Sequence, residues 1–335
     1  PFQQVLTNNG GWFSLIRKLN DERNRIIHDL KNNNMAIDNV KLFVLFQEFF
    51  KIFPLLIKLV LYYNDKKMKN NGEEKKKKMK ILITGSGTLI GNNIANYLLR
   101  KKKFVFALYN KNKPHNLKKF KNCRLIKSNL EKKIKFNICF DVLIHCASKI
   151  PSNKINKKNF KANIKMTNNL LKLCKQFGCK RIIYLSTMSI YGKITNKIVY
   201  EDLKPKNLDL YGLSKKISEN RILSFAENNL SIATIFRLPG VVGKDSKYNF
   251  LSNTLKKIKK KQPITISNVK SKFNNVVHVD NLKEIIFQSI KKEKSSQIYN
   301  LSSIRPIKIE SIINLFYKKL KKEKNYTIVK SKSGS

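Results

Sequence analysis

The stretch Tyr211-Gly212-Leu213-Ser214-Lys215 places a phenol and an ammonium four residues apart. Residues at that spacing share one face of a helix. A lysine held near a tyrosine hydroxyl stabilises the phenolate and lowers its pKa from an ordinary value of about 10. Such a pair can move a proton to or from a sugar or alcohol hydroxyl. The same spacing also describes a solvated helix face in a lysine-rich chain, so its meaning depends on whether a cofactor site accompanies it.

A glycine-rich segment at residues 85–91 follows a short apolar run, residues 80–84, and precedes a helical pattern. Glycines allow a tight turn and a close approach of the backbone to a pyrophosphate, which helix N-terminal N–H groups favour. A plain strand-to-helix turn is the alternative, but the strand, loop and helix context favours a dinucleotide site. We therefore expect cofactor contacts from Gly85, Gly87, Thr88, Leu89, Ile90 and Gly91.

From residue 80 onward, short apolar runs alternate with helical patterns, which is typical of parallel βαβ units. Strands are expected at residues 80–84, 104–108, 123–127, 141–146, 181–186 and 231–237, and helices at 90–101, 160–177, 211–228 and 307–322. These elements predict an α/β fold with a Rossmann-type doubly wound parallel sheet. The expected domains are a helical extension at 1–78, a dinucleotide-binding domain at 79–240 and a small substrate-binding subdomain at 241–335.

The N-terminal 78 residues are unlike the rest of the chain. They are rich in Phe and Leu, show no strand pattern and end in a lysine run. Met79 is a plausible native start, so residues 1–78 are expected to be upstream or unrelated sequence. Arg23 and His28 resemble the Arg-x4-His signature of HEPN-type helical domains, some of which are ribonucleases. Residues 40–63 are apolar but interrupted by charges and a proline, which favours an amphipathic helix over a membrane span.

The net charge of +49 raises the alternative of a nucleic-acid partner. Lysine is spread along the whole chain together with abundant Asn and Ile, and A/T-rich codons explain that composition. We therefore expect no nucleic-acid partner.

The five cysteines lack CxxC spacing, which predicts a reducing, cytoplasmic location. No metal site is expected.

The run at residues 104–108 bears on the choice of cofactor. An NAD site usually carries an acidic residue at the end of this strand, where it binds the adenosine ribose. Tyr109 and Asn110 stand there instead, followed by Lys111 and Lys113. The sequence thus leaves both NAD and NADP open.

The glycine loop and the Tyr-Lys pair together resemble the extended short-chain dehydrogenase/reductase family, in its NAD-dependent epimerase/dehydratase branch. The resemblance runs from about residue 79 to the end and includes further segments in the family's order: residues 141–148, 163–171, 184–192, 237–243 and 277–280. Family members usually continue beyond the last residues seen here, so a C-terminal truncation is expected.

The resemblance implies a role for each of three catalytic residues. Tyr211 would move the hydroxyl proton, Thr187 would share the reacting oxygen, and Lys215 would assist Tyr211 and hold the ribose. It also implies cofactor contacts from Tyr109, Asn110, Asn129, Leu130, Cys146, Ala147, Ser148, Asn163, Tyr211, Lys215, Leu238 and Pro239. NAD is the cofactor that the family favours.

The implied activity is that of an NAD(P)-dependent nucleotide-sugar epimerase acting through a transient ketone, in surface-polysaccharide synthesis. A ketoreductase or dehydrogenase would use the same residues. Sugar 4,6-dehydratases carry an Asp-Glu pair after the catalytic threonine, and Met188 and Ser189 stand there, so dehydration lacks its acid and base. A non-catalytic NAD(P) sensor is a further alternative, which retention of Thr187, Tyr211 and Lys215 argues against. A homodimer without a membrane span is expected.

Two departures weaken the assignment of the substrate. Family members often have an asparagine where Gly240 stands and an arginine where Asn274 stands. Phosphate contacts could come instead from Lys244, Lys270 or Lys272, which are equally well explained as solvated lysines.

Overall fold

The computed structural model describes residues 79–150, 157–194, 196, 198–244, 246–247 and 249–329. All of them belong to one compact unit that spans Lys78–Ser335. The expected helical extension, the Arg23 and His28 motif, the apolar stretch 40–63 and the last residues of the chain lie outside this description.

A seven-stranded, fully parallel sheet forms the centre of the described unit, in the order β11-β6-β5-β4-β1-β2-β3. Its strands are β1 (Lys80–Thr84), β2 (Phe104–Tyr109), β3 (Cys123–Lys127), β4 (Val142–His145), β5 (Arg181–Thr187), β6 (Ile232–Leu238) and β11 (Gln297–Asn300). The predicted α/β doubly wound fold is confirmed. Six of these strands match the expected runs to within one residue at each end, whereas β11 was not expected, because this short edge strand has no buried apolar run.

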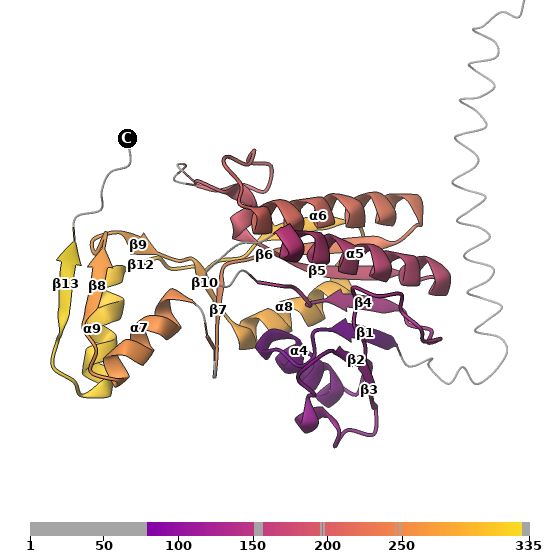
Figure 1. Ribbon diagram of the computed structural model, residues 1–335, viewed down its shortest axis with the longest axis horizontal. Helices are drawn as coiled ribbons and strands as arrows, with labels where there is room; N and C mark the ends of the chain where they lie inside the picture. Colours follow the sequence, from indigo (N-terminus) through magenta and orange to yellow (C-terminus); the bar gives the residue numbers. More distant parts are fainter. Residues whose placement is uncertain are drawn as a thin grey trace, which may run out of the picture. The chain divides into compact units, whose positions relative to one another are not determined.

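Helices cover both faces of the sheet (Figure 1). The helices α4 (Leu89–Arg100) and α8 (Val279–Lys292) lie on one face, and α5 (Lys157–Phe177) and α6 (Leu210–Asn228) lie on the other. Successive residues of a strand point to opposite faces. Ile81 and Ile83 accordingly join one hydrophobic cluster, while Leu82 joins the second. A parallel sheet buried on both faces explains why its strands are nearly continuous apolar runs.

The order of the strands reverses next to β1, which lies between β2 and β4. The chain therefore leaves β1 and β4 in opposite directions, and a crevice opens at their carboxyl ends. In doubly wound sheets ligands bind at this switch point.

A smaller group of elements follows β6. It contains β7 (Gly240–Val242), α7 (Phe250–Lys259), β8 (Ile264–Ser267), β9 (Lys272–Phe273), β10 (Val276–His278), β12 (Ile307–Lys308), α9 (Ile309–Leu320) and β13 (Tyr326–Val329). Ile258, Ile264 and Ile313 are buried in a separate core there. Since α8 and β11 return to the large sheet, residues after 240 serve both parts, and a domain boundary at that residue stays a prediction.

Candidate active site

The glycine loop between β1 and α4 is shaped by close backbone contacts. Gly85 has a φ of +71°, a conformation that glycine adopts without strain, and a Cβ there would lie 3.0 Å from the Ala147 amide nitrogen. A Cβ on Gly87 would lie 1.9 Å from the Asn112 carbonyl oxygen, and one on Gly91 would lie 2.3 Å from the Gly85 oxygen. The loops after β1, β2 and β4 therefore meet at the crevice because these residues lack side chains.

Thr88, a predicted cofactor residue, caps α4. Its Oγ1 accepts a hydrogen bond from the Gly91 N–H at 3.3 Å and donates one to the Gly85 carbonyl at 2.8 Å. The helix thus begins at the crevice, with its N-terminal N–H groups near the glycine loop. This arrangement fits the pyrophosphate of a dinucleotide cofactor.

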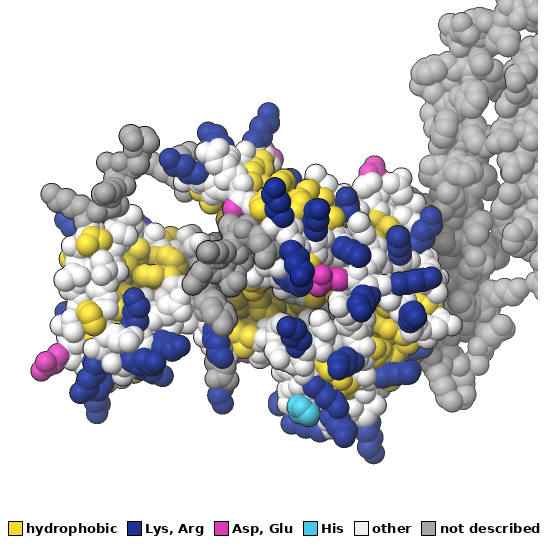
Figure 2. All heavy atoms as spheres, viewed as in Figure 1, with side chains coloured by type: hydrophobic (Ala, Val, Ile, Leu, Met, Phe, Trp, Pro, Cys, Tyr) yellow, Lys and Arg dark blue, Asp and Glu magenta, His cyan; other side chains and the backbone are white. Residues whose placement is uncertain are grey.

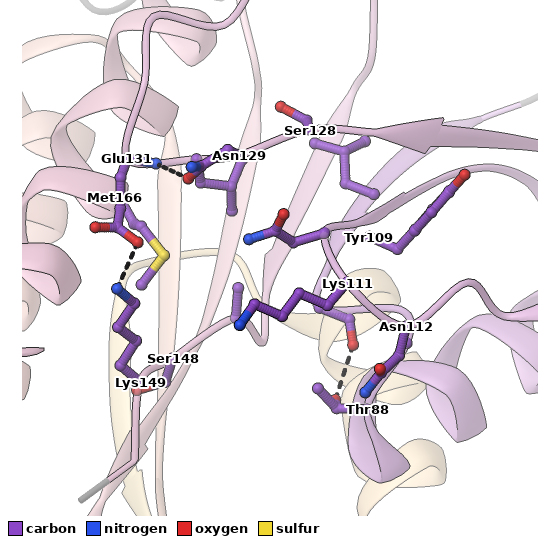
Figure 3. Close-up of a pocket in the computed structure, with 16 residues that line it drawn as sticks. Thr88, Tyr109, Lys111, Asn112, Ser128, Asn129, Glu131, Ser148, Lys149 and Met166 are labelled. Atoms are coloured by element: carbon purple, nitrogen blue, oxygen red, sulfur yellow. Dashed lines mark hydrogen bonds and ion pairs between the residues drawn. The ribbon is translucent and has the colours of Figure 1, made fainter.

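A pocket of about 190 Å³ lies at the carboxyl ends of the first four strands (Figure 3). Nine of the predicted cofactor residues line it: Gly85, Gly87, Thr88, Tyr109, Asn110, Asn129, Leu130, Ala147 and Ser148. The other predicted cofactor residues lie outside its lining: Leu89, Ile90, Gly91, Cys146, Asn163, Tyr211, Lys215, Leu238 and Pro239. For all of them, cofactor contact stays a prediction.

Seven further residues line the pocket: Leu108, Lys111, Asn112, Ser128, Glu131, Lys149 and Met166. Of these, the sequence argument considered only Lys111, together with Lys113, in the choice between NAD and NADP. Lys149 forms an ion pair with Glu131, with 2.7 Å between Nζ and Oε1 (Figure 3). Six of the seven lie at the end of a strand or in the loop after it, and that position is the signal that could have found them.

Thr187 and Tyr211 come from two elements that meet at Ser189. Thr187 ends β5, and its Oγ1 accepts a hydrogen bond from the Ser189 N–H at 3.2 Å, which caps the short helix η2 (Met188–Tyr191). Tyr211 lies in the first turn of α6, where the Asp209 side chain accepts from the Gly212 N–H at 2.6 Å. A Cβ on Gly212 would lie 2.3 Å from the Ser189 carbonyl oxygen. Glycine at this position therefore lets the start of α6 contact η2 beside Thr187.

Burial raises the pKa of Tyr211 above its ordinary value, a hydrogen bond with Ser148 opposes the shift, and the Asp209 carboxylate adds to it. The sequence argument predicted a lowered pKa through Lys215, and this prediction is wrong for the structure described. The reason is the position of Lys215. Its ammonium donates to the Leu185 carbonyl and lies 4.1 Å from the centre of the Tyr184 ring.

Lys215 is almost completely buried, with 2% of its surface exposed. Burial lowers the pKa of Lys215 to about 7, while the nearby Glu219 and Cys146 act in the opposite direction. A buried ammonium with a pKa near neutrality can change its charge during a proton transfer.

Asn163 links three elements around the pocket. Its Oδ1 accepts from the Lys149 N–H at 2.8 Å, and its Nδ2 donates to the Lys149 carbonyl at 3.1 Å and to the Ser214 hydroxyl at 3.2 Å. The Ser148 hydroxyl also donates to Asn163. The predicted cofactor residue Asn163 thus holds the loop after β4 against α5 and α6, and so fixes the serine that contacts Tyr211.

A buried ion pair lies beneath these residues. The Arg237 guanidinium donates to the Glu219 carboxylate at 2.8 Å, and both side chains are nearly inaccessible. Ser186, adjacent to Thr187, donates to the same carboxylate. Arg237 also donates to the Tyr191 hydroxyl at 2.6 Å. The pair therefore joins β5, β6, α6 and η2 underneath the catalytic candidates.

The lysines proposed for substrate phosphate are dispersed. Lys244, Lys270 and Lys272 are exposed and lie outside the lining of the pocket. Within the described residues there is no cluster of three His, Cys, Asp or Glu side chains placed to hold a metal ion. None of the described helices combines the length and apolar character that crossing a membrane requires.

Known proteins resemble this chain over most of its length. It is 28% identical over 230 residues to GDP-6-deoxy-D-talose 4-dehydrogenase of Aggregatibacter actinomycetemcomitans, which covers 67% of this chain and 74% of that protein. It is 28% identical over 271 residues to UDP-glucuronate 4-epimerase of Thermodesulfobacterium geofontis, covering 72% and 82%.

Among solved structures, UDP-glucuronic acid 4-epimerase of Bacillus cereus in complex with NAD shares the fold. The TM-score is 0.66 at 23% identity, with 76% of this chain and 88% of that one covered. The sequence model of the NAD dependent epimerase/dehydratase family matches residues 81–302. This match covers most of the chain, so the chain belongs to the NAD dependent epimerase/dehydratase family.

Proposed function

We propose that this chain is an NAD(P)-dependent nucleotide-sugar epimerase that inverts a sugar carbon through a transient ketone. The observation that carries the proposal is a set of contacts around Ser189. The start of α6, which carries Tyr211, packs against the Ser189 carbonyl, and the Ser189 N–H donates to Thr187. Tyr211 also hydrogen-bonds to Ser148, which lines the pocket. Membership of the family and the nucleotide-sugar epimerases among its relatives support the same activity.

A bound nicotinamide would supply reversible hydride transfer at the sugar carbon. The chain's own residues handle the proton. Tyr211 takes the proton of the sugar hydroxyl and gives it back, and Thr187 donates a hydrogen bond to the same oxygen. Lys215, one helical turn after Tyr211, would hold the ribose of the bound cofactor.

Neither Met188 nor Ser189 carries a carboxyl group, and they occupy the two positions after Thr187. Elimination of water needs an acid and a base at those positions in the related dehydratases. We therefore propose hydride and proton transfer without elimination of water.

A dehydrogenase is the second candidate, and one observation favours it. The relative from Aggregatibacter is a GDP-sugar 4-dehydrogenase rather than an epimerase. In that case the ketone would be substrate or product, and the cofactor would change its redox state with each turnover.

A homodimer and a cytoplasmic location complete the proposal. Both follow from the family resemblance, and cysteines without CxxC spacing support a reducing compartment. Sedimentation equilibrium tests the dimer, and fractionation of cells that express the chain tests the location.

Turnover by the full chain distinguishes the two candidates. The protein is incubated with NAD or NADP and a panel of UDP-, GDP- and dTDP-sugars, while absorbance and the stereochemistry of the sugar are followed by NMR. An inverted sugar without net cofactor reduction supports the epimerase, and a stoichiometric cofactor change supports the dehydrogenase. Cofactor binding without turnover of any sugar would favour the sensor.

The substitution Tyr211→Phe removes the proposed proton carrier. We expect kcat to fall by about 10²- to 10⁴-fold with little change in cofactor affinity, because the hydroxyl acts only in proton transfer. Tyr326→Phe makes the same chemical change in β13, and turnover should be unaffected. Full activity of the Tyr211→Phe variant would show that the mechanism is wrong.

A further inference from the structure

The carboxyl end of β2 is where a dinucleotide's adenosine ribose is recognised in this fold. An acidic side chain there accepts hydrogen bonds from the 2′-hydroxyl of NAD, while a cation accommodates the 2′-phosphate of NADP. Tyr109, Asn110, Lys111 and Asn112 line the pocket at this end, and none of them is acidic.

The structure distinguishes the two lysines that follow β2. Lys111 is among the residues that line the pocket, and its side chain extends into it (Figure 3). Lys113, two residues later, lies outside the lining. Only Lys111 is therefore placed to contact a group bound in the pocket.

The backbone that carries Lys111 is held against the glycine loop. The Ser86 N–H and the Ser86 hydroxyl both donate to the Leu108 carbonyl, each at 2.9 Å. The Asn112 carbonyl faces Gly87 so closely that a Cβ there would lie 1.9 Å from it. Lys111 stands between these two contacts, so its main chain is fixed beside the loop that receives the pyrophosphate.

The charges of the pocket favour an added anion at Lys111. Its lining contains three charged side chains, Lys111, Glu131 and Lys149. The Glu131 carboxylate is engaged by Lys149 at 2.7 Å, so its negative charge is largely neutralised. Within the described part of the chain, no carboxylate forms an ion pair with Lys111.

We propose that Lys111 binds the 2′-phosphate of NADP(H), so that this chain binds NADP(H) in preference to NAD(H). The ammonium attracts the phosphate dianion as a point charge. Because no acid stands at the end of β2, no carboxylate there accepts from a 2′-hydroxyl or repels a 2′-phosphate. The inference rests on the proposed function, because it concerns the cofactor of the same site.

Direct binding tests the assignment without any turnover. The full chain is titrated by calorimetry with NADP⁺ and NAD⁺, and then with 2′,5′-ADP, 3′,5′-ADP and AMP. We expect NADP⁺ to bind about tenfold or more tightly than NAD⁺, and 2′,5′-ADP to bind more tightly than both other fragments. The 3′-phosphate isomer controls for general attraction of anions by a chain of net charge +49.

Two variants locate the effect. Lys111→Ala should bring the affinities for NADP⁺ and NAD⁺ to within about threefold of each other, chiefly because NADP⁺ binds more weakly. Lys113→Ala removes the same charge outside the pocket and should leave the ratio as in the unaltered chain. Both lysines are exposed, so neither variant is expected to impair folding.

Three results would overturn the proposal. If NAD⁺ binds as tightly as NADP⁺, the preference for NADP(H) is wrong, but the proposed epimerase activity is unaffected. Equal binding of the 2′- and 3′-phosphate fragments, or an equal effect of the two lysine variants, would show attraction by net charge alone. If neither dinucleotide binds, the proposed function falls together with the inference.

Discussion

Lys215 shows how far a side chain's surroundings alter its ordinary chemistry. Its ammonium is enclosed between the Leu185 carbonyl and the ring of Tyr184. Removal of water disfavours the charged form more than these contacts and Glu219 favour it, so the pKa of Lys215 falls to about 7. In an unfolded chain the same group titrates near pH 10.4.

This difference predicts a dependence of stability on pH. Above about pH 7 the unfolded chain holds a proton on Lys215 that the folded chain has released, so the free energy of unfolding should rise with pH. The rise should be measurable from about pH 7 to pH 9, with an upper limit of about 1.4 kcal/mol per pH unit. Burial raises the pKa of Cys146 to about 12, so at higher pH the folded chain keeps a proton that the unfolded chain releases. That group therefore lowers the free energy of unfolding as the pH rises above this range.

Lys215→Met keeps an unbranched apolar chain without the titrating group. Urea unfolding of both proteins at several pH values checks the prediction, because the difference between their slopes isolates Lys215 from most other groups. Identical slopes for the two proteins would contradict the lowered pKa.

At the scale of elements, the start of α6 is positioned by a missing side chain. Gly212 allows the first turn of α6, which carries Tyr211, to lie against the carbonyl of Ser189, whose N–H donates to Thr187. Helix propensity alone would favour alanine over glycine at such a position, by roughly 0.5–1 kcal/mol. The tertiary contact reverses that preference.

Gly212→Ala should consequently destabilise the chain and lower turnover. The new Cβ would lie 2.3 Å from the Ser189 oxygen, so α6 or η2 must shift and separate the two catalytic candidates. We expect kcat/KM to fall by at least about tenfold, since small misplacements of reacting groups are costly. Leu213→Ala, the neighbouring partly exposed position, should change kcat/KM little. Retention of full activity by Gly212→Ala would mean that this contact does not position Tyr211.

At the scale of the molecule, one buried ion pair joins elements that are far apart in the sequence. Glu219 from α6 and Arg237 from β6 pair with each other, and Arg237 reaches Tyr191 in η2. Tyr191 in turn donates to Asn300 of the edge strand β11 at 2.8 Å. The carboxyl edge of β5, β6 and β11 is thus stabilised by a single network.

Glu219→Gln should be strongly destabilising, by about 3–5 kcal/mol, because it leaves the buried Arg237 without its counter-charge. A second substitution, Arg237→Met, should restore part of the loss, and the double-mutant cycle measures the coupling. The exposed Lys283–Asp280 pair is the control, and Asp280→Asn should leave the urea midpoint unchanged. Equal effects at the two pairs would contradict the importance of burial.

Charge at this scale is spread rather than concentrated. Lysine and arginine side chains are scattered over the visible face of the described unit, above several elements of the fold (Figure 2). A nucleic-acid site usually gathers such residues in one stripe or patch. The distribution on this face therefore agrees with composition as the origin of the high net charge.

The parts predicted well from sequence are those governed by local chemistry. Residues 80–84 coincide with β1, because a buried parallel strand is a short apolar run with clear boundaries. Residues 123–127 coincide with the edge strand β3, which is only partly buried. The start of α4 was expected one residue late, and Thr88 was expected to contact the cofactor but not to cap the helix. The edge strand β11 gave no signal, because it is only four residues long and two of them, Gln297 and Asn300, are polar.

The sequence by itself determined the fold class, the glycine loop and the nature of the chemistry, because turn preferences, periodicity and residue types act within a few neighbouring residues. Only the tertiary structure decided which distant groups meet: Lys215 with Tyr184, Glu219 with Arg237, and Lys111 rather than Lys113 with the pocket. These meetings depend on strand order and helix packing, which bring together residues that no local pattern links. Burial at those contacts then set the pKa of Lys215 and tied the buried charges into pairs.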